Sequence, residues 1–180
     1  MIHPIKFIAI AAVDEKLGIG KDGHLLVSIP EDQKDVFRRE TLGSAVVFGR
    51  KTLDTFPGRR ALPNRWNIVM SRNPDFSQDG MTVAHSQEEL LEILASEGDR
   101  FWETEAKDRK CFVIGGADIY KSLLPLCSAV ILTRIRHSFS ADAWFPDVEN
   151  SPDWVLVEES PPVLSVTGYE FTVVKYERTI

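Results

Sequence analysis

The chain has 180 residues, 43% of them apolar, and its net charge is −6 at neutral pH. This length suits one compact domain over residues 1–180 with a full hydrophobic core. No segment approaches the roughly 20 apolar residues that cross a bilayer, so a membrane protein is not expected.

Residues 50–72 hold six cations against one acid, Asp54, so this segment is +5 and the rest of the chain is −11. One basic patch on an acidic protein suits a small anionic ligand better than nucleic acid, which calls for a wider basic face. An ordinary solvated basic surface is the alternative.

The cysteines and histidines do not suggest a disulfide framework or a metal site. Cys111 and Cys127 form no CxxC pair, which makes a reducing cytoplasm the simplest setting. The four histidines are scattered and lack metal-ligand spacing: His3, His24, His85 and His137. The apolar run 7–13 is at the short limit for a signal peptide and is followed by acids, so it is interpreted as a buried strand.

In chain order, strands are predicted at 6–13, 45–49, 66–71, 81–84, 111–114, 129–136, 154–159 and 169–177. Helices are predicted between them at 31–41, 51–56, 86–97 and 117–124, and the third opens with Ser86 and Glu89 in capping-box spacing. Several strands are continuous apolar runs, which is typical of strands buried on both faces. The order predicts an α/β fold: a central, mostly parallel, twisted sheet of about eight strands flanked by four helices, with antiparallel C-terminal strands. The charged segment 99–110 is expected to be a solvated insertion.

The segment Gly18–Gly23 matches the GxGxxG pattern but lacks its context. A dinucleotide fingerprint requires a helix to start inside the motif, whereas here the first possible helix start is Pro30. A P-loop fails as well, because Lys21 is followed by Asp22. We therefore expect a mobile loop over a cleft, with a plain turn as the alternative.

A carboxylate pair opens the first predicted helix. Pro30 suits the first helical turn, and Glu31 and Asp32 follow where the helix dipole stabilises negative charge. Ordinary capping explains both acids, so a functional role is about as well supported as a structural one. Asp32 lies one turn before Val36 on the predicted inner face and is expected to point inward, with Glu31 pointing outward.

Two strand–glycine–helix junctions resemble phosphate sites. Cys111–Ile114 ends in Gly115-Gly116 before a helix, and Val46–Phe48 ends in Gly49 before Arg50-Lys51-Thr52. Glycines allow close approach of a ligand to the backbone, and a helix N-terminus favours an anion. Ser71 and Arg72, at the end of another strand, suit a phosphate monoester. A tight turn is the alternative for Gly115-Gly116 taken alone.

Taken together, these segments resemble the dihydrofolate reductase family over nearly the whole chain. No single motif is specific, but their order and spacing jointly are. The resemblance rests on 11–14, 17–20, 29–32, 47–52, 62–65, 67–71, 113–116, 119–120, 132–133 and 142–146.

The resemblance implies NADPH-dependent reduction of 7,8-dihydrofolate to tetrahydrofolate by a monomer that also binds antifolate inhibitors. Asp32 is expected to bind the 2-amino group and ring nitrogen of the pterin, with Thr133 hydrogen-bonded beside it and Leu25 at the reacting centre. Arg65 is expected to bind the glutamate α-carboxylate. The further substrate contacts implied are Ala11, Val36 or Phe37, Phe56, Leu62, Ile114 and Tyr120. The NADPH contacts implied are Ala12, Ile19, Gly20, Gly49, Arg50, Lys51, Thr52, Ser71, Arg72, Gly115, Gly116, Ala117, Asp118 and Ile119, with a cis peptide at 115–116.

Two departures from the family pattern stand out. Leu26-Val27 replaces the usual Pro-Trp, which removes an indole that commonly orders a water near the pterin. The helix from Asp32 to Thr41 is one residue longer than the common pattern, which leaves the choice between Val36 and Phe37 open. A related reductase of a ribosylamino-pyrimidine and a non-catalytic NADPH-binding module are the alternatives; Arg65 and Asp32 argue against the first.

Overall fold

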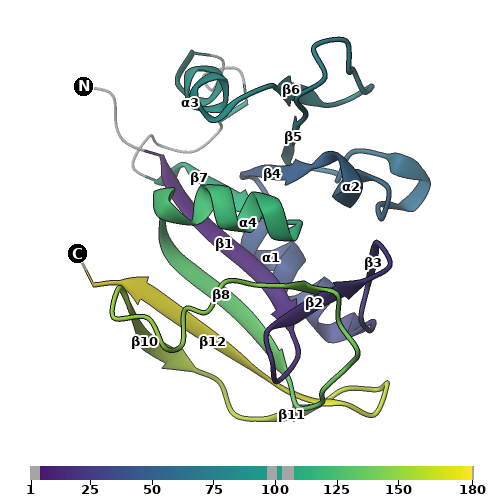
Figure 1. The fold of residues 1–180 in the computed structure, drawn as a ribbon, viewed down its shortest axis with the longest axis vertical. Coiled ribbons are helices and arrows are strands. Elements are labelled where there is room, and N and C mark those ends of the chain that lie inside the picture. Colours follow the sequence, from purple (N-terminus) through teal and green to yellow (C-terminus); the bar gives the residue numbers. More distant parts are fainter. Residues whose placement is uncertain (1–4, 97–100, 103–107, 180) are drawn as a thin grey trace.

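The computed structural model describes residues 5–96, 101–102 and 108–179. Its main sheet has the strand order β10-β12-β8-β1-β7-β4-β5-β6, and β11 pairs with β12. Pairs within β8-β1-β7-β4-β5-β6 are parallel, and β12 is antiparallel to β8, β10 and β11. The strands are β1 (Lys6–Val13), β4 (Ala45–Gly49), β5 (Trp66–Met70), β6 (Thr82–Ala84), β7 (Lys110–Val113), β8 (Cys127–Ile135), β10 (Trp154–Glu159), β11 (Val163–Leu164) and β12 (Glu170–Arg178). The predicted mostly parallel sheet with an antiparallel C-terminal part is confirmed (Figure 1).

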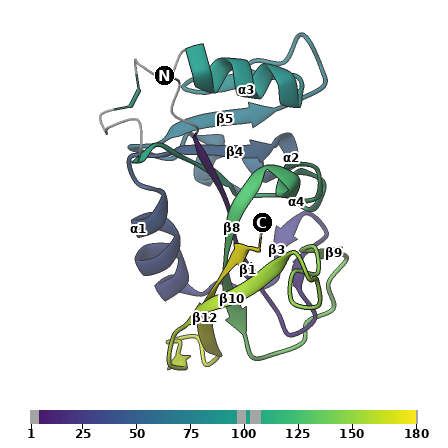
Figure 2. The ribbon, with the colours of Figure 1, turned by 90° about the vertical axis from the view of Figure 1, so that its left-hand side faces the viewer.

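The core is divided between the two faces of this sheet. Because side chains alternate along a strand, Ala45 and Val47 of β4 join one buried cluster and Val46 and Phe48 the other. The first cluster includes residues of α3 (Gln87–Ser96) and α4 (Ala117–Leu123), and the second includes residues of α2 (Arg50–Leu53) and the helix before α1. Figures 1 and 2 show α4 and α1 on opposite sides of the sheet.

The first helix begins as a π-helix, η1 (Asp32–Phe37), and continues as α1 (Arg38–Thr41). A π-turn accommodates one residue more than an α-turn, and such turns are frequent at functional sites. It offers a physical explanation for the longer helix that the resemblance implied. It also decides which side chain enters the core, because Val36 is buried at 7% exposure and Phe37 is only partly buried.

Residues 18–25, predicted as a mobile loop over a cleft, form a β-hairpin that lines a cavity. β2 (Gly18–Lys21) pairs with β3 (His24–Leu25) through an Asp22-Gly23 turn, in which both residues have positive φ, 51° and 78°. An Asp-Gly pair favours this two-residue turn because the turn needs left-handed backbone at both positions. On its other side β2 pairs with β9 (Ala143–Trp144), which completes a small three-stranded sheet.

The solvated insertion expected at 99–110 falls largely on residues outside those described, namely 99–100 and 103–107. Within it, Trp102 is buried at 7% exposure and packs edge-on against Trp66, with ring centroids 5.8 Å apart. For this residue the expectation was wrong, because the indole extends the core above β5.

The remaining predicted helices lie within three residues of their expected bounds, as α2, α3 and α4. The capping box is also present, since Glu89 N–H donates to Ser86 Oγ over 3.1 Å; the Glu89 carboxylate, however, accepts from His85 N–H at 2.8 Å. The described residues also include the short 3₁₀ turns η2 (Pro57–Arg59) and η5 (Leu124–Leu126). No helix in the described ranges is long and apolar enough to span a membrane.

Asp14 joins the hairpin to the C-terminal half of the chain. Its carboxylate is 1% exposed and accepts N–H bonds from Lys16 (2.9 Å), Gly18 (2.8 Å) and Phe139 (2.9 Å). The neighbouring Glu15 carboxylate accepts only an exposed bond from Ser138 Oγ at 3.2 Å. Asp14 thus fixes the position at which the chain leaves β1 and enters β2.

We predict that Asp14→Ala lowers the free energy of unfolding by about 3 kcal/mol, because each N–H left without an acceptor in the interior costs about 1–3 kcal/mol. Glu15→Gln is the matched control and should stay within about 0.5 kcal/mol of wild type. Urea unfolding of the three proteins measures both effects. Equal stabilities for the two variants would show that Asp14 is not the anchor.

Candidate active site

Two adjoining cavities open at the carboxyl ends of the parallel strands, where ligands bind in open α/β sheets. The smaller encloses about 230 Å³ and the larger about 1300 Å³. They meet beside β1, β7, α2 and the β2–β3 hairpin. The residues that line both cavities are Ala11, Ala12, Ile19, Leu25, Thr52, Thr55, Ile114 and Tyr120.

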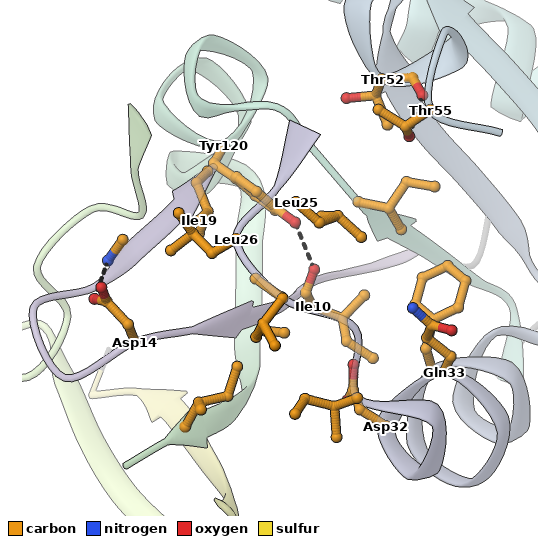
Figure 3. A pocket seen from close by; sticks show the side chains of 18 of the residues that line it. Ile10, Asp14, Ile19, Leu25, Leu26, Asp32, Gln33, Thr52, Thr55 and Tyr120 are labelled. Atoms are coloured by element: carbon orange, nitrogen blue, oxygen red, sulfur yellow. Dashed lines mark hydrogen bonds between the residues drawn. The ribbon is translucent and has the colours of Figure 1, made fainter. Parts of the chain in front are cut away.

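Asp32 is one of two carboxylates on the smaller cavity, whose other lining side chains are mainly apolar (Figure 3). Asp32 sits at the start of η1, and its Oδ1 accepts a hydrogen bond from Thr133 Oγ1 of β8, a residue that is 1% exposed. Burial raises the pKa of Asp32, and the Thr133 hydrogen bond acts in the opposite direction. Asp14 also lines this cavity, but its oxygens are engaged by the backbone N–H groups described above.

Most of the residues that the sequence assigned to the substrate lie on this cavity: Ala11, Leu25, Asp32, Phe37, Phe56, Leu62, Ile114 and Tyr120. Val36 does not belong there, because the π-turn directs it into the core with Val46 and Phe48 and leaves Phe37 at the cavity wall. Thr133 and Arg65 are not among the lining residues; Thr133 Oγ1 donates to Asp32, and the Arg65 guanidinium lies over the Phe37 ring.

Glu31 lies outside the cavity and anchors the helix start. Its carboxylate accepts hydrogen bonds from Val166 N–H and from Ser165 Oγ, both at 2.8 Å, in the turn between β11 and β12. The bond from the Val166 backbone is the main reason that the pKa of Glu31 is lowered, with a further contribution from Ser165. The two adjacent acids therefore have opposite environments, and Glu31 helps to orient Asp32.

Arg65 lies beyond Phe37, on the outer side of the cavity. Its Nε donates to Pro63 O at 2.9 Å, its Nη1 donates to Thr41 Oγ1 at 3.2 Å, and its guanidinium carbon lies 5.9 Å from the Phe37 ring centroid. Burial, and then the nearby positive charge of Arg38, lower the pKa of Arg65. A partly buried guanidinium beside a second cation is a good binding site for a carboxylate.

The larger cavity is lined by every residue that the sequence assigned to the cofactor: Ala12, Ile19, Gly20, Gly49, Arg50, Lys51, Thr52, Ser71, Arg72, Gly115, Gly116, Ala117, Asp118 and Ile119. The predicted cis peptide at Gly115-Gly116 is confirmed.

Two of its glycines are required for different reasons. A Cβ on Gly49 would lie 3.0 Å from Ile119 Cγ1, which is a tight contact, and Gly115 has a φ of 124°, a conformation that other residues rarely adopt. Gly49 N–H also donates to Gly115 O at 2.9 Å, which holds the two strand ends together.

Tyr120 lines both cavities, at the junction between them. Its hydroxyl donates to Ile10 O at 2.7 Å, and its ring packs edge-on against Phe145 at 4.8 Å (Figure 3). Burial raises the pKa of Tyr120, which keeps the hydroxyl neutral. The residue thus supports the shape of the junction.

Sequence reasoning missed several lining residues. Gln33 and Thr55 line the smaller cavity, and His85, Ser86 and Gln87 line the larger. His85 could have been found, because it directly follows a predicted strand, as Arg50 and Arg72 do. Gln33 could not, because an α-helical projection does not anticipate the π-turn.

The raised pKa of Asp32 has a consequence for stability. The folded protein binds the Asp32 proton more tightly than the unfolded chain does, so the contribution of Asp32 to stability falls as pH rises above the ordinary carboxyl pKa of about 4. We predict that ligand-free Asp32→Asn melts at a higher temperature than wild type at pH 7, and that the difference shrinks toward pH 4. Thermal unfolding at both pH values tests this; an equal or lower melting temperature at pH 7 would contradict it.

Comparison with known proteins agrees with this geometry. The family model described as dihydrofolate reductase matches residues 6–178. The chain is 34% identical over 170 residues to the dihydrofolate reductase of Bacillus subtilis (strain 168), covering 94% of this chain and 92% of that one, and 34% identical over 175 residues to that of Staphylococcus haemolyticus, covering 97% and 96%. Dihydrofolate reductase from Enterococcus faecalis, solved with NADP(H) and RAB-propyl, superposes with a TM-score of 0.81 at 32% identity, covering 97% of both chains. The chain therefore belongs to the dihydrofolate reductase family.

Proposed function

We propose that the smaller cavity binds the pterin of 7,8-dihydrofolate and the larger one binds NADPH. As a member of its family, the chain is an NADPH-dependent oxidoreductase that forms tetrahydrofolate. The observation that carries the assignment of the cavities is Asp32, the carboxylate of the smaller cavity that backbone N–H groups do not engage as they do Asp14, in a mainly apolar cavity that opens onto a larger, cationic, glycine-lined one.

The larger cavity fits a phosphorylated dinucleotide. Arg50, Lys51 and Arg72 supply positive charge, and the helices that begin at Arg50 and Ala117 have no side-chain N-caps, so their first N–H groups are available to phosphate oxygens. We assign the pyrophosphate to Gly115, Gly116 and the start of α4. Arg50, Ser71 and Arg72 are assigned to the 2′-phosphate.

In this reaction the protein mainly has to position the two reactants, because bound NADPH supplies the hydride. Asp32 accepts the paired N–H groups of the 2-aminopterin edge, and in a cavity of low polarity its negative charge favours protonation of the ring system. Thr133 fixes the carboxylate by its hydrogen bond. The walls at Leu26 and Val27 are apolar, so the protein offers no indole N–H there, and we propose that water carries the proton to N5 from the open side of the cavity.

Phe37 is proposed to pack against the substrate on one side, where a family member with an uninterrupted α-helix would use the residue at the position of Val36. Arg65, behind Phe37, is proposed to bind the α-carboxylate of the glutamate tail. The contacts of Arg65 with Thr41 and Phe37 hold the guanidinium at this edge of the cavity.

We also propose that the chain acts as a monomer in a reducing cytoplasm. One chain supplies the lining of both cavities, so a single copy can hold both reactants. The two cysteines are buried free thiols, Cys111 and Cys127.

We predict that Asp32→Asn reduces turnover at pH 7 by roughly two orders of magnitude or more, while NADPH affinity changes by less than about threefold. Only the pterin loses its charged partner. Oxidation of NADPH on addition of dihydrofolate measures turnover, and fluorescence titration measures NADPH binding. Glu31→Gln is the matched control and should have a much smaller effect on turnover; similar losses in both variants would overturn the assignment of Asp32.

Arg65→Leu should weaken dihydrofolate binding by about 2–5 kcal/mol, the usual cost of removing one partner of a desolvated charge pair. A pterin without the glutamate tail provides the control ligand, because its affinity should hardly change. Calorimetry with both ligands makes the comparison. If both lose affinity equally, Arg65 supports the structure and does not bind the tail.

A further inference from the structure

His85 lies in the larger cavity beside the residues proposed for the 2′-phosphate. It directly follows β6, as Ser71 and Arg72 follow β5, and these strands are parallel neighbours with Met70 opposite Ala84. Ser71 N–H donates to Ala84 O at 3.0 Å, which brings the two strand ends into contact. The His85 ring therefore lies against the strand end that carries Ser71 and Arg72, and all three residues line this corner of the cavity.

One ring nitrogen of His85 already takes part in a hydrogen bond within the protein. Nδ1 lies 2.8 Å from Ser71 O, and because a carbonyl oxygen only accepts, Nδ1 carries the hydrogen of that bond. Nε2 is then the atom that gains or loses a proton. A neutral Nε2 offers only a lone pair to an anion, whereas a protonated one donates a charge-assisted hydrogen bond.

The backbone of His85 is fixed as well. Its N–H donates to Glu89 Oε2 at 2.8 Å, and Glu89 N–H is bonded to Ser86 Oγ at 3.1 Å. With the ring held at Ser71 O and the main chain at Glu89, little rotamer freedom remains to be lost on binding. Ser71 Oγ accepts from Asn73 N–H at 3.3 Å, which leaves the hydroxyl hydrogen free to donate to a ligand.

The charges around this corner come from several elements. Glu89 of α3 is the one acid bonded directly to the His85 residue in the described structure, and it is engaged by backbone N–H. The other charged groups that line the cavity are Lys21 of β2, Arg50 and Lys51 of α2, Arg72 after β5, Asp118 and Lys121 of α4, and Asp142 before β9. Cations outnumber carboxylates among them, which favours binding of an anion in this cavity.

We propose that His85 is a specificity-determining residue whose protonated ring binds the phosphate monoester that distinguishes NADPH from NADH. Cofactor preference is then linked to pH, because uptake of a proton at Nε2 accompanies binding of the phosphate. The inference rests on the proposed binding of NADPH in the larger cavity, and adds to it a residue and a pH dependence.

The test compares binding of 2′,5′-ADP and 5′-AMP to the full chain, and of NADPH and NADH, by calorimetry at constant ionic strength between about pH 5.5 and 8.5, the range over which histidine changes charge. The wild type should prefer the 2′-phosphorylated ligand about tenfold more strongly at the acid end than at the alkaline end. In His85→Gln, whose amide can still donate to Ser71 O, the preference should be smaller at low pH. The dependence that remains should be only that of the phosphate itself, which titrates near pH 6.

Two variants make the comparison specific. His137→Gln removes a histidine that packs against Phe139 and Tyr169, away from the cavity, and should keep the wild-type pH dependence. Arg72→Ala should reduce the preference at every pH, because an arginine does not titrate in this range.

The possible outcomes distinguish a failure of the proposed NADPH binding from a failure of the role of His85. If the wild type binds neither dinucleotide, the proposed function fails. If it prefers NADPH but His85→Gln has the same pH profile as wild type, the role of His85 is overturned and the proposed function stands. NMR of the wild type gives an independent readout that does not depend on the variant folding: 2′,5′-ADP, but not 5′-AMP, should raise the titration midpoint of one imidazole, and the absence of such a change would contradict the inference.

Discussion

The site depends on one carboxylate held in an apolar cavity by a single hydroxyl. Asp32 is stabilised as an anion by Thr133 alone among the described side chains, while burial opposes its charge. Several parts of the fold are needed to keep it there. Thr133 lies on the buried strand β8, between β1 and β12, and Glu31 ties the helix start to the turn before β12. The antiparallel C-terminal strands thus support the site, although they do not line the centre of either cavity.

The two cavities differ in polarity and charge. The smaller has low polarity, so one negative charge in it acts strongly on a bound ring. The larger is lined by cations and by glycines that allow phosphates to approach the backbone. They meet at Ala11, Ile114 and Tyr120, near the ends of β1 and β7, which is where the two reactants proposed for the cavities would meet. A parallel sheet provides this arrangement because its strand ends gather at one edge.

Sequence patterns predicted the long strands well, because continuous apolar runs such as 45–48 leave little alternative to burial on both faces. They missed the β2–β3 hairpin, although Asp22-Gly23 is a hairpin turn signal, because the strands that flank it are only a few residues long. Among site residues, Asp32 and the phosphate-type glycines could be identified from local chemistry and spacing. The choice of Phe37 over Val36 could not, because it depends on a π-turn. His85 belongs to no motif, and its position directly after a predicted strand was the signal that sequence reasoning overlooked; strand register then places it beside Ser71.

The most direct test of the account is a ¹³C NMR titration of the Asp32 carboxyl in the ligand-free protein, with the resonance assigned by its loss in Asp32→Asn. The account predicts a titration midpoint above the ordinary aspartate value of about 3.9, because burial outweighs the Thr133 hydrogen bond. Thr133→Val should raise the midpoint further, since it removes the interaction that favours the anion. A midpoint at or below the ordinary value, unaffected by Thr133→Val, would contradict the central claim that the pocket holds Asp32 as a desolvated charge fixed by one hydroxyl.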